Sequence, residues 1–122
     1  MVVKDPKNFV KESEKIKIKA EEEDFKLVLM PRYDEFRDLA IEMAKEDVQF
    51  REVSGNDEIL LTAIGKKGDY ESLKITKIVG TSKVVTHQDE ERILVLTPIF
   101  SLSETLNKLI ENNFKIEHIF DY

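Results

Sequence analysis

Two histidines are the side chains in this sequence best suited to acid–base chemistry near neutral pH. The alternation of a strand places His118 on one face with Ile116 and Phe120, where a histidine can act as a general base. No residue near it in the sequence completes a catalytic set. The favoured interpretation is therefore a histidine at the edge of the core that is hydrogen-bonded through one ring nitrogen.

Two further stretches contain polar groups of interest. His87 precedes the acidic residues 89–91, whose carboxylates can raise its pKa or share a metal ion with it. Residues 65–68 have the sequence Gly-Lys-Lys-Gly, which can hold a phosphate but lacks the Walker pattern. We interpret both stretches as solvated turns. The chain has no cysteine and only two histidines, a poor supply of ligands for zinc, so we predict no metal site. No nucleophile or cofactor motif stands out, so we also predict no cofactor and no catalytic residue.

Arg32 and Tyr33 lie just past the end of a predicted strand, residues 25–30, which is apolar except for Lys26. Ligands gather where strands end, so this pair can meet an anionic molecule. The alternative is an exposed helix start. Arg32, Tyr33 and His118 are the three residues that we predict to bind a ligand.

Length and composition indicate one domain over residues 1–122, large enough to bury a core. The net charge of -6 disfavours nucleic acid, because binding phosphate backbones needs clustered Lys and Arg. The N-terminal residues contain no apolar signal stretch, and apolar runs of four or five residues are too short to span a membrane. We expect a cytoplasmic protein with no membrane partner.

Two strand–helix–strand units dominate the periodicity. In the first, a helix begins at Asp34, a strand follows at 48–54, and turn residues 54–57 predict a hairpin to a strand at 58–64. In the second, residues 93–96 form a strand. A helix then starts with a capping box formed by Ser101 and Glu104 and ends at Asn112-Asn113.

The two units share a short sequence match, since Leu-Val-Leu-Met-Pro at 27–31 resembles Leu-Val-Leu-Thr-Pro at 94–98. Residues 1–24 are expected to be an N-terminal arm or edge strand, because lysine and isoleucine alternate at 15–19. Residues 65–91 predict an inserted hairpin, with strands at 73–79 and 83–87.

These elements predict an α+β fold: ferredoxin-like βαβ units with extra hairpins, and two helices on one face of a mainly antiparallel sheet. The predicted core consists of apolar residues on the two helices and their preceding strands: Leu27, Leu29, Phe36, Leu39, Met43, Leu94, Leu96, Leu106, Leu109 and Ile110.

Residues 93–122 resemble the strand–helix–strand of ACT-like domains, which are small ferredoxin-like regulatory modules. The resemblance rests on the apolar strand, the turn at Pro98, the helix ending at Asn112-Asn113 and the strand at 115–120. It implies a small-ligand or regulatory role and side-by-side pairing. Glycine usually follows the proline in that family, whereas Ile99 follows it here, so no ligand contacts are carried over.

The resulting hypothesis is a non-enzymatic, cytosolic module for small-ligand binding, regulation or protein interaction that acts as a homodimer. Helices cover one sheet face only, so Val53, Leu60 and Ile119 are expected to need a second subunit as cover. The inserted hairpin is the alternative cover, and it would leave a monomer. The alternative function is a small hydrolase or isomerase that uses His118 with a carboxylate.

Overall fold

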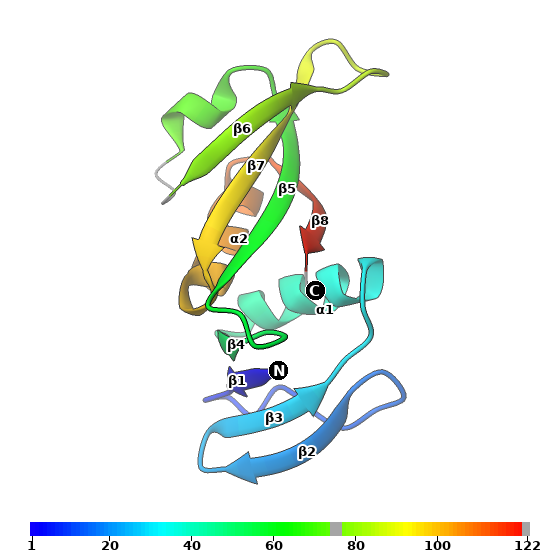
Figure 1. The fold of residues 1–122 in the computed structure, drawn as a ribbon, viewed down its shortest axis with the longest axis vertical. Helices are drawn as coiled ribbons and strands as arrows, with labels where there is room; N and C mark the ends of the chain where they lie inside the picture. Colours follow the sequence, from blue (N-terminus) through cyan, green and yellow to red (C-terminus); the bar gives the residue numbers. More distant parts are fainter. Residues whose placement is uncertain (74–76, 121–122) are drawn as a thin grey trace.

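The computed structural model describes residues 1–73 and 77–120 and confirms the α+β class (Figure 1). The first half contains β1 (Val2–Lys4), β2 (Lys17–Glu22), β3 (Phe25–Leu29), α1 (Asp34–Lys45) and β4 (Gln49–Glu52). The second half contains β5 (Glu58–Lys66), η1 (Asp69–Ser72), β6 (Ile78–Lys83), β7 (Glu90–Pro98), η2 (Ile99–Ser101), α2 (Leu102–Glu111) and β8 (Lys115–Phe120). All described strand pairs are antiparallel.

The strands lie in two four-stranded sheets, one from each half, where the sequence suggested one larger sheet. Both sheets have the same topology, with the orders β2-β3-β1-β4 and β6-β7-β5-β8. In each sheet, the first strand pairs with the third and the fourth. The helix of each half therefore connects the two strands that flank the first strand. The chain is thus a tandem repeat, and the matched residues 27–31 and 94–98 occupy equivalent places in it.

The regions expected to be an arm and an inserted hairpin correspond to each other in this repeat. β2 and β6 are both second strands at the edge of their sheets. In sequence, residues 5–16 separate β1 from β2, and β6 likewise follows β5 after an intervening stretch, of which residues 67–73 and 77 are described. Residues 1–24 therefore include an edge strand, as predicted, and also β1, a central strand that the sequence pattern did not reveal.

One hydrophobic core joins the two halves. α1 packs against α2 and also against β8 of the second sheet, while α2 contacts β4 of the first (Figure 1). The predicted core residues Phe36, Met43, Leu106 and Leu109 are fully buried there. Burying a side chain of this size stabilises the fold by about 1.5–3 kcal/mol, so the shared core holds the repeats together.

The prediction of which strand residues belong to the core is wrong by one position along each strand. Leu27 and Leu29 are 42% and 53% exposed, and Leu94 and Leu96 are half-buried, as are Leu39 and Ile110. The buried residues are their neighbours, including Val28, Ile93 and Val95. Side chains alternate along a strand, so a register error of one residue exchanges the two faces.

Two predicted hairpin details are also wrong. β4 and β5 lie in different sheets, and the turn at residues 54–57 connects the sheets; Val53 and Asn56 form an isolated bridge there. β6 runs through Gly80 as one strand with a register shift, so residues 80–82 are not a turn and 83–87 is not a strand. The predicted strand at 73–79 lies partly outside the described residues.

The helix ends agree with the sequence in part. Asn113 has φ of 67° and terminates α2, as predicted. The capping box does not form: Ser101 makes no side-chain cap bond, and Glu104 instead pairs with Lys108 at 3.3 Å. Because η2 runs directly into α2, the turn before Leu102 is already helical. No helix in the described part of the chain is long and apolar enough to cross a membrane.

Candidate functional site

The second sheet has one face that the helices leave open. Its inner side chains, such as Leu61 and Val95, are fully buried. Leu60, Leu96 and Phe120 pair across β5, β7 and β8 on the outward face, and each is only half-buried. Val53 and Ile119, expected to need cover from a second subunit, are already buried within the protomer at 2% and 0% exposure. Leu60 alone of those three lies on the open face.

A register shift in β8 determines which polar groups reach this face. Thr62 pairs with His118 and Ala63 with Ile116, so Glu117 is the extra residue of a bulge. Its carboxylate accepts a hydrogen bond from Thr62 Oγ1 at 2.9 Å, which places it on the outward side. His118 lies beside it and contacts the Phe120 ring edge to face, with 4.4 Å between ring centroids.

Glu117 forms the best-defined ion pair of the face. Arg92 Nε donates to its Oε1 at 2.6 Å and Arg92 Nη2 to its Oε2 at 2.7 Å, a bidentate geometry. The hydrogen bond from Arg92 lowers the pKa of Glu117; burial opposes that shift, and the Thr62 hydroxyl adds to it. The same hydrogen bond raises the pKa of Arg92. The pair therefore stays charged at neutral pH, and Glu117 is a weak base.

A cavity of about 650 Å³ opens above this pair. Ile64, Gly65 and the Arg92–Glu117 pair line it from the sheet. The β6–β7 loop contributes Val84, Thr86, His87 and Asp89 on one side, and Asn113 and Lys115 contribute from the β8 side. Its volume lies within the range of small-molecule sites in proteins. We refer to it as the sheet cavity.

Charged residues line the sheet cavity on both sides of β5. Asp89 and Glu90 lie at the start of β7, whereas Lys115 starts β8; Lys66 pairs with Glu90 across β5 and β7. His87 Nδ1 is 3.0 Å from the Thr86 hydroxyl, within the same loop. The β7 side of the cavity thus carries Asp89 and Glu90, with the cation Lys66 beside them, and the β8 side carries Lys115. We refer to these two sides as the acidic wall and the basic wall.

The three residues predicted to bind a ligand lie apart. Arg32 lines a second cavity of about 300 Å³, with Val28, Met30 and Phe36 among its other lining residues. Tyr33 precedes α1 and is 57% exposed. Among the cavities described for residues 1–73 and 77–120, none is lined by both Arg32 and His118.

The structure instead brings together two stretches that looked weak in the sequence. Lys66, from the Gly-Lys-Lys-Gly stretch, and His87 line the same sheet cavity. Arg92, Lys115 and Glu117, which belong to no motif recognised in the sequence, line the same cavity. Their strands alternate apolar and polar residues, but only the strand pairing shows that these positions adjoin. Within the described residues, no three His, Asp or Glu side chains are arranged to hold a metal ion.

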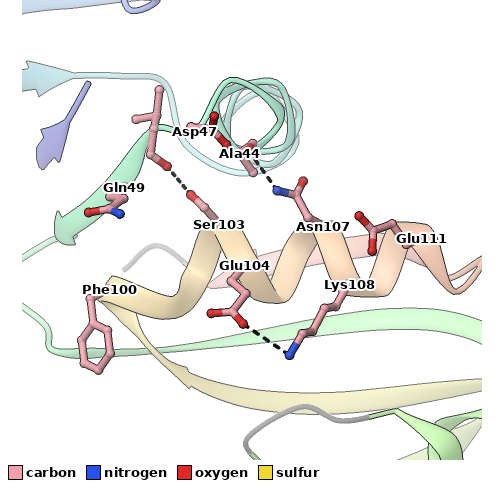
Figure 2. Close-up of a pocket in the computed structure, with 10 residues that line it drawn as sticks. Ala44, Asp47, Gln49, Phe100, Ser103, Glu104, Asn107, Lys108 and Glu111 are labelled. Carbon is pink, nitrogen blue, oxygen red and sulfur yellow. Dashed lines mark hydrogen bonds and ion pairs between the residues drawn. The ribbon is translucent and has the colours of Figure 1, made fainter. Parts of the chain in front are cut away.

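A third cavity, of about 420 Å³, lies between α2 and the end of α1 (Figure 2). Its polar side chains already join the two halves of the chain. Ser103 donates to the Val48 carbonyl, and Asn107 Nδ2 donates to the Ala44 carbonyl at 3.0 Å (Figure 2). We interpret this cavity as part of the structural contact between the two halves of the chain. Asn107 thus bonds a carbonyl in the last turn of α1, and Ser103 bonds one that lies beyond the helix.

Comparison of the chain with protein-family models, with curated proteins and with solved structures finds no match. The geometry and charge of the sheet cavity are therefore the strongest indication of function in the described part of the chain.

Proposed function

We propose that the chain is a non-enzymatic, cytosolic binding module that takes up a small zwitterionic molecule in the sheet cavity and acts as a homodimer. The observation that carries the proposal is the charge arrangement of this cavity. Asp89 and Glu90 offer a carboxylate wall to a cationic group, and Lys115 offers an ammonium to an anionic one. The ACT-like resemblance of residues 93–122 agrees with a ligand-binding role.

The Arg92–Glu117 pair favours a ligand that carries both charges. Each partner already satisfies the other, so the pair presents a polar surface without net charge to the cavity. A ligand with a single charge would meet one matching wall and one repelling wall. A zwitterion is attracted at both ends.

The alternative, a hydrolase or isomerase using His118 with a carboxylate, has weaker support. Glu117 is the adjacent carboxylate, and Arg92 holds it in the charged form with a lowered pKa. His118, the base of that alternative, lines none of the cavities described for residues 1–73 and 77–120. Binding without chemistry is thus the function that the cavity favours.

Isothermal titration calorimetry with three probes of similar length tests the proposal. γ-Aminobutyrate is a zwitterion, succinate a dianion and putrescine a dication. We expect saturable binding of γ-aminobutyrate and at least tenfold weaker binding of the other two. Lys115→Ala and Asp89→Asn should each weaken the binding of γ-aminobutyrate about tenfold, as expected for loss of one charge-assisted contact. Lys45→Ala, at an exposed position on α1, is the matched control.

Two results would contradict the proposal. One is the absence of saturable heat with γ-aminobutyrate at millimolar concentration. The other is binding that Lys115→Ala and Asp89→Asn leave unchanged while the folded state, checked by circular dichroism, is intact. Preferential binding of succinate would reassign the cavity to anions.

A further inference from the structure

The outward face of the first sheet carries an apolar stripe on β3. Phe25, Leu27 and Leu29 are 39%, 42% and 53% exposed. The residues between them, Lys26 and Val28, are 4% and 0% exposed, on the side that faces the core. Because successive side chains of a strand point to opposite faces, the three exposed residues lie in a row. We refer to them as the β3 stripe.

Neighbouring strands extend the β3 stripe with apolar side chains. Val2 of β1 and Ala20 of β2 both pair with Leu27 on the outward face. An antiparallel sheet usually exposes polar residues on its solvent face, so five apolar side chains in one patch are unusual. Exposed apolar surface of this kind marks an interaction site.

Charged residues flank the β3 stripe in an ordered way. On β2, Lys17 pairs with Leu29 and Glu22 pairs with Phe25, so the β2 side of the stripe has opposite charges at its two ends. Both side chains are exposed. Within the described residues neither forms an ion pair, although the chain contains several others. Away from β2, Lys4 and Arg51 lie 6.0 Å and 5.7 Å from the centroid of the Phe25 ring.

The charge order along β2 is self-complementary. A two-fold axis that crosses the strands at Leu27 lays the stripe of one copy antiparallel on that of another. Leu27 then faces Leu27, and Phe25 faces Leu29 of the second copy. The same rotation brings Lys17 of each copy opposite Glu22 of the other, which forms two equivalent ion pairs. Sheets pack face to face in this manner at about 10 Å separation.

We propose that a second copy of this chain docks on the β3 stripe through this two-fold axis. An unrelated partner would have no reason to match the order of Lys17 and Glu22, whereas a second copy matches it by symmetry. The inference deepens the proposed function, because it specifies the homodimer interface. It places that interface on the first sheet and leaves the sheet cavity, on the second, open to its ligand.

Sedimentation equilibrium of the full chain between micromolar and millimolar concentration tests the interface. We expect a dimer for the wild type, and for Leu27→Glu a dimer dissociation constant at least a hundredfold higher. Val85→Glu changes an apolar residue that is 94% exposed in the β6–β7 loop, so it should leave the constant unchanged. Circular dichroism and a thermal melt confirm that each variant is folded.

Charge reversal tests the two-fold axis itself. Lys17→Glu and Glu22→Lys should each raise the dissociation constant about tenfold, since two attractive pairs become repulsive in the symmetric dimer. The double variant restores both pairs and should return the constant to within about threefold of the wild type. This rescue is not expected of a residue that merely supports the local fold.

Three results would overturn the inference. The first is a wild-type chain that stays monomeric at millimolar concentration. The second is loss of the dimer in Leu96→Glu, on the open face of the second sheet, with Leu27→Glu still dimeric. The third is a double charge reversal that fails to rescue. Each leaves the γ-aminobutyrate titration unaffected, so failure of the interface and failure of the ligand site are distinguishable.

Discussion

Replacing Lys26 by methionine should destabilise the first sheet severely. Lys26 is 4% exposed, and its Nζ donates to Asp5 Oδ2 at 2.8 Å, Asn8 Oδ1 at 2.6 Å and the Val10 carbonyl at 2.7 Å. All three ammonium protons are therefore used. These bonds attach residues 5–10 to β3. In the second half of the chain, Ile93 occupies the equivalent position and is buried without a charge.

The expected magnitude follows from the environment of Asp5. This carboxylate is 2% exposed and also accepts hydrogen bonds from the backbone N–H groups of Phe9 and Val10. Lys26→Met keeps the length of the side chain but leaves the carboxylate buried without its counter-ion. Removing one partner of a buried ion pair costs about 3–5 kcal/mol.

Urea denaturation at pH 7, followed by circular dichroism, measures this loss of unfolding free energy. Lys45→Met, at an exposed position of α1, is the matched control and should change the free energy by less than about 0.5 kcal/mol. A loss below about 1 kcal/mol for Lys26→Met would refute the reasoning, because it would mean that the ion pair is not a buried anchor.

The pH dependence provides a second check on the same pair. Burial raises the pKa of Asp5, but the hydrogen bonds from Lys26 and the backbone lower it by more, so it lies below the ordinary value of 3.8. The stabilisation is complete above that value and is lost as pH falls through the lowered pKa. In Lys26→Met the burial remains and the main lowering bond is gone. The free-energy gap between the two proteins should therefore narrow from pH 7 to pH 3.

Three further predictions concern the core and the second sheet. Leu106→Ala should cost about 2–5 kcal/mol in urea denaturation, because the side chain is fully buried in the shared core. Gly65→Ala should cost about 1–3 kcal/mol, since an added Cβ would lie 2.5 Å from the Phe114 ring, and Phe114→Leu should relieve part of that cost. Glu117→Gln should lower the urea midpoint at pH 7. Because Arg92 lowers the pKa of Glu117 below 4.5, that difference should hold above pH 4.5 and disappear as pH falls below it.

The sequence predicted the elements of this fold better than their arrangement. Apolar periodicity located both helices and most strands, because a helix stripe and a strand alternation have different periods. It could not tell which face of β3 is buried. Leu27 and Val28 are both apolar, and the core selects Val28 through contacts with distant elements. Lys26 is buried too, because Asp5 and Asn8 accept hydrogen bonds from its ammonium group inside the fold.

The pairing of the strands was the second feature that the sequence could not predict. A turn between two strands predicts a hairpin, yet the turn after β4 leads into a different sheet. The strand order of the repeat explains this result, because β4 pairs with β1 and β5 pairs with β8. The sheet cavity depends on such pairings. Glu117 reaches Arg92 through a bulge that no local pattern encodes.

An NMR titration of the isotopically labelled chain with γ-aminobutyrate tests the central claim most directly. The claim is that the sheet cavity binds a zwitterion between its charged walls. We expect saturable amide shift changes at residues 64–66, at residues 86–90 and at Lys115, with little change around Arg32. Shift changes that centre on Arg32 and Phe36, or none at millimolar ligand, would contradict it.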